Sequence, residues 1–163
     1  RLWRLALVVV LAALVSSSAA VFFGGKWISG SLFLLNLFLV GAAPVVIINS
    51  LVRRRVIDLR TVLGAVCVYV LIGMMWSFAF TAIGTFDSRA FFAQQSNATV
   101  ADYLYFSFVT MTTTGYGDLT AAHGLGRALA VLEALIGQLY LVTVIALLVS
   151  NLSRRGRATQ PEV

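Results

Sequence analysis

The sequence predicts an all-α membrane protein, and its composition and the distribution of its apolar residues support this class. Hydrophobic residues make up 60% of the 163 residues and charged residues 11%, and the mean hydropathy is +0.95. Soluble domains contain roughly 45–50% apolar and about 25% charged residues. The one cysteine and the one histidine are too few for an intrachain disulfide or a metal cage.

Four apolar runs are long enough to cross the hydrocarbon layer as helices of about 20 residues. In chain order they cover residues 5–23, 31–51, 61–83 and 125–152. The first run also resembles a secretory signal peptide, because arginines precede it and small residues follow Val15. Its apolar character continues to Phe23, beyond the 7–15 residues of a signal-peptide core, and favours a spanning helix. Since the chain does not begin with Met, we expect it to be processed or trimmed.

A shorter element is predicted between the third and fourth runs, after the polar residues 85–99. The amphiphilic stretch Val100–Met111 is too short to cross and has the length of a buried or re-entrant helix. Thr99 and Asp102 resemble a capping box at its start, with Asp in place of Glu or Gln. The electronegative end of this helix would point toward the membrane centre, where a cation needs stabilising.

The most specific pattern follows at residues 110–118, which read TMTTTGYGD. Its two glycines allow backbone angles that residues with a Cβ avoid, so consecutive carbonyls can point to one side. Four such segments around one axis form rings of oxygen that replace the hydration shell of a potassium ion. Together with the aromatic stretch 103–109, the pattern resembles the selectivity filter and pore helix of the potassium channel family. The chain is similar to bacterial-type members with one pore domain per subunit.

The resemblance implies a role for each filter residue. The Thr113 hydroxyl would form the innermost ion site, and the other potassium ligands would be backbone carbonyls. The implied filter residues are Thr113, Thr114, Gly115, Tyr116 and Gly117, and the first four would bind K⁺. Asp118 would anchor the filter at its outer mouth or attract cations. Apart from the permeant ion, the resemblance implies no cofactor.

Two residues depart from the family pattern. Thr114 stands where Val or Ile is usual, and Ala121 stands where Pro is common. The Thr114 hydroxyl needs a hydrogen-bond partner behind the filter. We expect that partner to be Glu133 or the pore helix, with an effect on filter stability rather than on the ion sites.

The fourth run resembles the inner helix of the family. Gly137 stands twenty residues after Gly117, where a hinge glycine is common, and predicts a gate; close helix packing is the alternative. Glu133 is an ionisable group within a span and so a candidate functional residue. It could brace the pore helix against the Thr112 or Thr114 hydroxyl, or be a neutral structural acid. Gln138 is predicted to face the cavity, above a further set of candidates: Leu141, Val142 and Ile145.

The basic residues predict the orientation. In the family the pore loop enters from the extracellular side, so both ends of the third and fourth helices would be cytoplasmic. Nine basic residues then lie inside: Arg1, Arg4, Arg53, Arg54, Arg55, Arg60, Arg154, Arg155 and Arg157. Three lie outside: Lys26, Arg89 and Arg127. The positive-inside rule agrees with this orientation and predicts a multi-pass cell-membrane protein with both termini cytoplasmic.

The arginine cluster at Arg53, Arg54 and Arg55 does not indicate a voltage sensor, which needs arginines at every third position along a span. We interpret the cluster as a positive-inside anchor, with contact to anionic lipid headgroups as a second role. Since the basic residues flank the apolar runs, they do not indicate nucleic-acid binding.

These observations predict a potassium-selective channel. Residues 1–55 would form two peripheral transmembrane helices, residues 56–153 a pore domain, and residues 154–163 a short cytoplasmic tail. The pore domain would contain an outer helix, a re-entrant pore helix with the filter, and an inner helix. Each chain has one filter and a closed ring needs four, so a homotetramer is predicted.

Three alternatives to a potassium channel make different demands on the sequence. A weakly selective cation channel typically lacks the tyrosine that is present here as Tyr116. A membrane enzyme would need a nucleophile–base or metal constellation, and the sequence has none. A non-conducting regulatory membrane subunit remains open at this point.

Overall fold

The computed structural model describes Val15, residues 25–52 and residues 59–158. Within these ranges the chain forms four helices, α2 (Lys26–Val52), α3 (Leu59–Phe86), α4 (Val100–Met111) and α5 (Gly124–Ala158). The first predicted run, apart from Val15, and the cluster Arg53–Arg55 lie outside the described residues.

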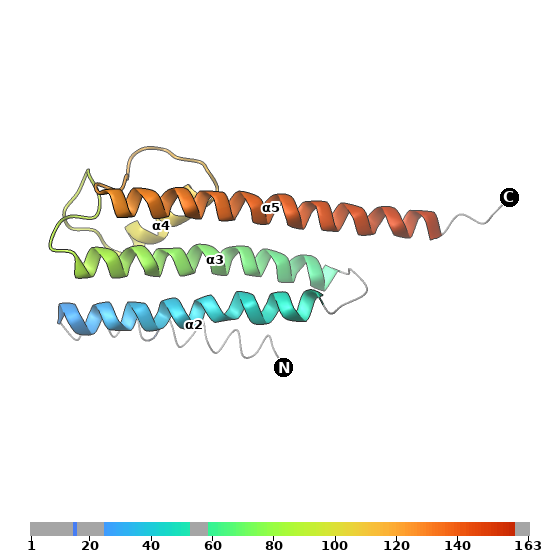
Figure 1. The fold of residues 1–163 in the computed structure, drawn as a ribbon, viewed down its shortest axis with the longest axis horizontal. Coiled ribbons are helices and arrows are strands. Elements are labelled where there is room, and N and C mark those ends of the chain that lie inside the picture. The colour runs from blue at the N-terminus through green and yellow to red at the C-terminus, as the bar shows by residue number, and fades with distance from the viewer. Residues whose placement is uncertain (1–14, 16–24, 53–58, 159–163) are drawn as a thin grey trace.

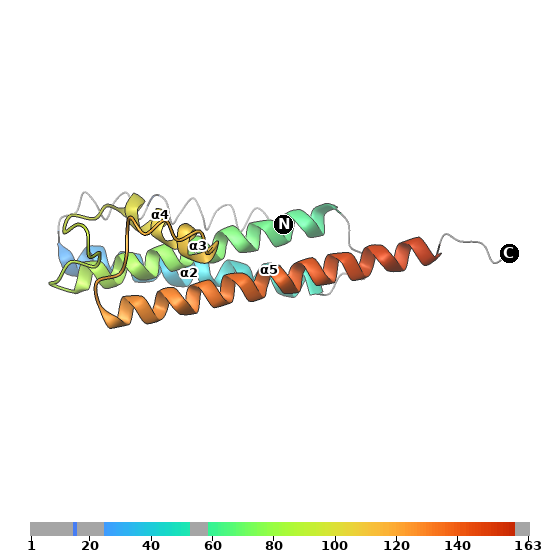
Figure 2. The ribbon, with the colours of Figure 1, turned by 90° about the horizontal axis from the view of Figure 1, so that it is seen from above.

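The long helices lie side by side, and the short α4 lies at the end where α3 finishes and α5 begins (Figures 1 and 2). Successive long helices run in opposite directions, and the C-terminal part of α5 extends beyond the other two (Figure 1). Helix α2 packs against α3, whereas α4 packs against both α3 and α5. The arrangement therefore places α4 and the segment after it beside the pair α3–α5.

Two helices in the described part are long and apolar enough to cross a membrane. They are Thr61–Phe86 in α3, with 26 residues, and Gly124–Val144 in α5, with 21 residues. The third and fourth predicted runs therefore form helices, with bounds that extend a few residues further. In α2 the apolar stretch Ser29–Val45 is shorter than a span by the same criterion.

Helices α2 and α3 share an apolar interface. Its buried residues are Phe33, Val40, Ala43, Leu71, Phe78 and Ala82. On the other side of α2, Phe38 is 75% exposed, and Leu139 and Val142 of α5 are 67% and 65% exposed. Extended apolar surface of this kind is typical of contact with lipid or with another protein chain.

A cluster of aromatic residues fixes α4 against α3 and the adjoining loops. It consists of Trp76, Phe80, Phe91, Phe92, Tyr103 and Phe106, with Ala121. The ring centroids of Phe80 and Phe106 are 5.2 Å apart and those of Phe91 and Tyr103 are 5.3 Å apart, both edge to face. Edge-to-face pairs stabilise beyond their buried area. An isolated bridge between Phe92 and Ala121 joins the loops on either side of α4.

Candidate functional site

Helix α4 begins at the predicted capping box. The Thr99 amide donates to Asp102 Oδ2 over 2.7 Å, and the Asp102 amide donates to Thr99 Oγ1 over 3.3 Å. Hydrogen bonds from the Thr99 backbone and side chain hold the pKa of Asp102 below its ordinary value. The predicted bounds of the helix, 100–111, and its cap are confirmed.

Helix α4 ends directly in the TMTTTGYGD segment. The Thr113 amide donates to the Thr110 carbonyl oxygen (2.9 Å), and the Thr114 amide donates to the Val109 carbonyl oxygen (2.9 Å). Thr113 itself has φ of 55°. These features form a Schellman motif, which satisfies the last carbonyls of a helix and normally has glycine at the left-handed position. Here a β-branched residue takes that position, at a cost of about 1–3 kcal/mol for a left-handed residue other than glycine.

The sign of the backbone angle φ alternates from residue 113 to residue 117. Positive φ occurs at Thr113 (55°), Gly115 (55°) and Gly117 (81°), and Thr113 is the one non-glycine residue with positive φ in the described part. Alternating right- and left-handed residues turn successive peptide groups the same way, whereas an extended strand alternates them. A Cβ on Gly115 or Gly117 would meet no described atom within 4 Å. These positions therefore need glycine for their backbone angle, as predicted, and not for space.

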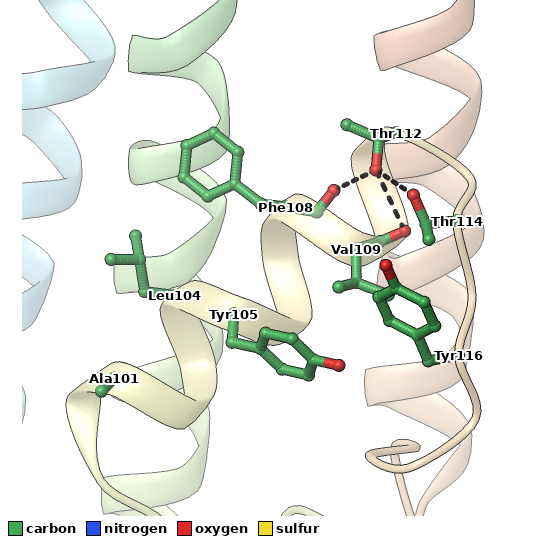
Figure 3. A pocket seen from close by; sticks show the side chains of 8 residues that line it. All are labelled: Ala101, Leu104, Tyr105, Phe108, Val109, Thr112, Thr114 and Tyr116. Atoms are coloured by element: carbon green, nitrogen blue, oxygen red, sulfur yellow. Dashed lines mark hydrogen bonds between the residues drawn. The ribbon is translucent and has the colours of Figure 1, made fainter.

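The Thr114 hydroxyl meets the end of α4. Thr112 Oγ1 donates to the Phe108 carbonyl oxygen over 2.6 Å and lies 2.8 Å from Thr114 Oγ1 (Figure 3). Because the Thr112 hydrogen is committed to Phe108, the Thr114 hydroxyl is the donor to Thr112. Of the two predicted partners for Thr114, the structure has the pore-helix end and not Glu133.

One side of α4 and the segment after it line an open groove of about 420 Å³ (Figure 3). Its lining runs along α4 from Ala101 to Thr112 and continues to Thr114 and Tyr116. Tyr116 is 72% exposed in the single chain. Residues 112–118 are all exposed in the single chain, whereas Met111 is buried.

Asp118 is bound to α4 through a residue that the sequence analysis did not single out. Tyr105 donates from its hydroxyl to Asp118 Oδ2 over 2.7 Å, and its ring stacks on Tyr116 with centroids 6.5 Å apart. The hydrogen bond to Asp118 raises the pKa of Tyr105 to about 12. A phenol thirteen residues before a carboxylate is no signal by itself, since the loop between them decides whether they meet.

At Thr113 the TMTTTGYGD segment contacts α5. Gln138 Nε2 donates to Thr113 Oγ1 over 3.2 Å. A Cβ on Gly137 would lie 2.7 Å from the Met111 carbonyl oxygen, so the absence of a side chain allows α5 to approach the end of α4. The structure therefore has the close helix packing that was the alternative role of Gly137. That Gly137 is the hinge of a gate stays a prediction. Leu141 is half-buried and Val142 exposed, while the side chain of Ile145 lies outside the described part.

Glu133 contacts α4 at a different residue from those predicted. It is fully buried, and its Oε1 lies 2.5 Å from Ser107 Oγ. The predicted contacts of Glu133 with Thr112 and Thr114 are wrong, because Glu133 faces the buried side of α4 and those two hydroxyls face the groove. Ser107 was missed, since a serine among aromatic residues gives no hint of a partner 26 residues away.

The sequence is similar to a known family and to known proteins. The family model described as "Ion channel" matches residues 71–154, which is more than half of the 163 residues. The chain is 31% identical over 85 residues to potassium voltage-gated channel subfamily A member 5 of human, mouse and ferret. The match covers 49% of this chain and 14% of each relative, so the chain spans a small part of these proteins. No solved structure matches.

Proposed function

Since the chain belongs to the ion channel family, with the pore loop of its potassium channel members, we propose that it conducts K⁺ passively across the membrane. Membership of this family makes it a membrane-embedded channel protein and not an enzyme. The conducting path would be a filter of backbone carbonyl oxygens contributed by four subunits.

The observation that supports this best is the alternation of positive φ at Thr113, Gly115 and Gly117 directly after α4. A row of peptide groups turned the same way presents one oxygen per residue to a common axis. Such rings of oxygen replace ion hydration in potassium filters. In the proposed filter the Thr113 hydroxyl and the carbonyls of residues 113–116 bind the ion, and Asp118 supports the outer mouth.

The open groove beside the filter supports assembly. A filter segment left bare in lipid would expose unpaired backbone groups, which costs several kcal/mol per group. Four copies around a fourfold axis would cover each groove and bring four filter segments to that axis. The exposed apolar side chains of α5, among them Leu139 and Val142, give such a homotetramer further surface to bury.

The remaining assignments complete the proposed channel. Residues 56–153 would form the pore domain, residues 1–55 two peripheral helices and residues 154–163 a tail, with both termini cytoplasmic as the basic residues favour. Arg53, Arg54 and Arg55 would meet anionic headgroups. Gln138, Leu141 and Ile145 would line the cavity, Gly137 would be the hinge, and Glu133 would support the filter. Potassium is the permeant ligand, and no further cofactor is proposed.

Reversal potentials test the proposal. Purified protein reconstituted in liposomes or planar bilayers should give currents that reverse near the K⁺ equilibrium potential in a K⁺–Na⁺ gradient. Equal permeability would replace the proposal with a weakly selective cation channel. The absence of any barium-sensitive K⁺ flux from tetrameric protein would favour a non-conducting regulatory subunit. The molecular mass of the detergent-solubilised protein, by light scattering, tests the homotetramer separately.

A further inference from the structure

Three helices meet at the hydroxyl of Ser107. Its Oγ lies 2.7 Å from the Gly73 carbonyl oxygen of α3 and 2.5 Å from Glu133 Oε1 of α5. Ser107 and Glu133 are both 0% exposed in the single chain. The contact is therefore sealed within one subunit before any neighbour is added.

The hydrogens at this site can be counted. A serine hydroxyl has one hydrogen, and a backbone carbonyl only accepts. If Ser107 donates its hydrogen to the Gly73 carbonyl oxygen, the hydrogen between Ser107 and Glu133 must come from a protonated carboxyl group of Glu133. If Glu133 were ionised and took the Ser107 hydrogen, two acceptor oxygens would face each other over 2.7 Å with no hydrogen between them.

The surroundings of Glu133 favour the same assignment. Its second oxygen, Oε2, is buried and has no hydrogen-bond partner among the described residues. The ion pair found in the described ranges is Arg89–Asp87, and it leaves Glu133 without a cation there. A buried carboxylate without a cation or several donors is far more costly than the neutral acid.

A close approach of backbones makes the contact possible. A Cβ on Gly73 would lie 2.9 Å from side-chain atoms of Met111 and of Phe108, so glycine lets α4 lie directly on α3. The Ser107 side chain then reaches the α3 main chain. Gly137 likewise allows a close approach, here of α5 to the end of α4, because a Cβ on Gly137 would lie 2.7 Å from the Met111 carbonyl oxygen.

We propose that Glu133 is a neutral acid and a positioning residue, which donates to Ser107 while Ser107 donates to Gly73. The two hydrogen bonds in series hold α5, α4 and α3 at fixed separations behind the TMTTTGYGD segment. Since residues 113 and 114 are bonded to the last turn of α4, a shift of α4 would move the inner end of that segment.

Infrared spectroscopy of the purified protein tests the protonation state. At neutral pH the wild-type protein should show a protonated-carboxyl stretching band that disappears in Glu133→Gln. The control is Asp102→Asn, which should remove no such band, because hydrogen bonds from Thr99 hold the pKa of Asp102 low. A spectrum unchanged by Glu133→Gln means that Glu133 is ionised, and overturns the proposal. This readout does not depend on conduction.

Matched substitutions test the positioning role, and this arm rests on the proposed function. Glu133→Gln keeps a neutral donor to Ser107 and should leave the K⁺/Na⁺ permeability ratio within about twofold of wild type. Glu133→Met has similar length but no donor, and should lower the ratio about tenfold, the size of change that one buried hydrogen bond supplies. If the Met variant does not fold, a folded and selective Gln variant still supports the role. A Gln variant as impaired as Met, or a Met variant as good as Gln, overturns it.

Discussion

The two faces of α4 differ in what covers them. One face is covered within the chain, and its buried residues are Tyr103, Phe106, Ser107 and Met111. The other lines the open groove, where Leu104 and Tyr105 are 40% and 38% exposed. Contacts within one chain therefore fix the position of α4, whereas the groove face is uncovered in the single chain and would be covered by a neighbour in the proposed homotetramer.

The largest expected effect comes from emptying the buried face. Phe106 packs edge to face on Phe80 and Phe92, with ring centroids 5.2 and 5.3 Å away. Phe106→Ala should lower the free energy of unfolding by about 3–5 kcal/mol, the usual cost of such a cavity. Denaturant unfolding in mild detergent, followed by tryptophan fluorescence, measures it. Leu104→Ala on the groove face is the control and should change this value by less than about 1 kcal/mol. Equal losses in the two variants would break the comparison.

The second-largest effect is expected on ion selectivity, from a substitution that opposes the backbone angle of Gly117. Gly117→Ala places a Cβ at φ of 81°, which costs about 1–2 kcal/mol in the left-handed region. We expect the K⁺/Na⁺ permeability ratio, measured from reversal potentials, to fall about tenfold, since 1.4 kcal/mol is a factor of ten.

Gly124→Ala is the matched control for Gly117. A Cβ there also meets no described atom within 4 Å, but Gly124 lies at the start of α5 without a positive φ. Its permeability ratio should stay at the wild-type value. An equal loss in both variants would mean that the positive φ is not what requires glycine at position 117.

A smaller effect, on how fast K⁺ flux declines, is expected from the hydrogen bond between Tyr105 and Asp118. The pKa of Tyr105 is raised from 10.0 to about 12 because its neutral hydroxyl donates to Asp118. The bond is therefore fully present below about pH 10 and lost as the pH rises toward 12. During sustained opening, wild-type K⁺ flux should therefore decline faster between pH 10 and 12 than it does below pH 10. Tyr105→Phe should decline faster at every pH, with no further step between pH 10 and 12. A Phe variant indistinguishable from wild type at pH 8 would show that the bond does not support the mouth.

The smallest effect is expected at the Thr112–Thr114 pair. Thr114→Val removes one hydroxyl of the 2.8 Å contact and keeps the shape and the backbone carbonyl. Ion selectivity should be preserved, and the rate at which flux declines should change. Loss of selectivity itself would contradict the role given to this side chain.

The sequence predicts those parts of the molecule that depend on near neighbours. The bounds of α4 and its cap follow from Thr99, Asp102 and an apolar stretch of the right length. The positive φ of Gly115 and Gly117 follows from the backbone freedom of glycine. These signals lie within a few residues of the structure they specify, so a single chain is enough to interpret them.

Contacts between distant elements could not be predicted in this way. The partner of Glu133 depends on which side of α5 faces α4, and an apolar helix gives no periodic pattern from which to assign that side. Thr113 was expected in the filter, but its left-handed backbone opposes the preference of a β-branched residue. The surrounding hydrogen bonds of the Schellman motif override that local preference.

The link between α4 and the segment after it has a consequence for protein engineering. The amides of residues 113, 114 and 115 all donate to carbonyl oxygens of residues 109 and 110, so this set of hydrogen bonds joins main-chain atoms only. It does not depend on which side chains stand at positions 109 and 110. Spectroscopic labels or unnatural amino acids at Thr110, which does not line the groove, can therefore report on the proposed filter without breaking these hydrogen bonds.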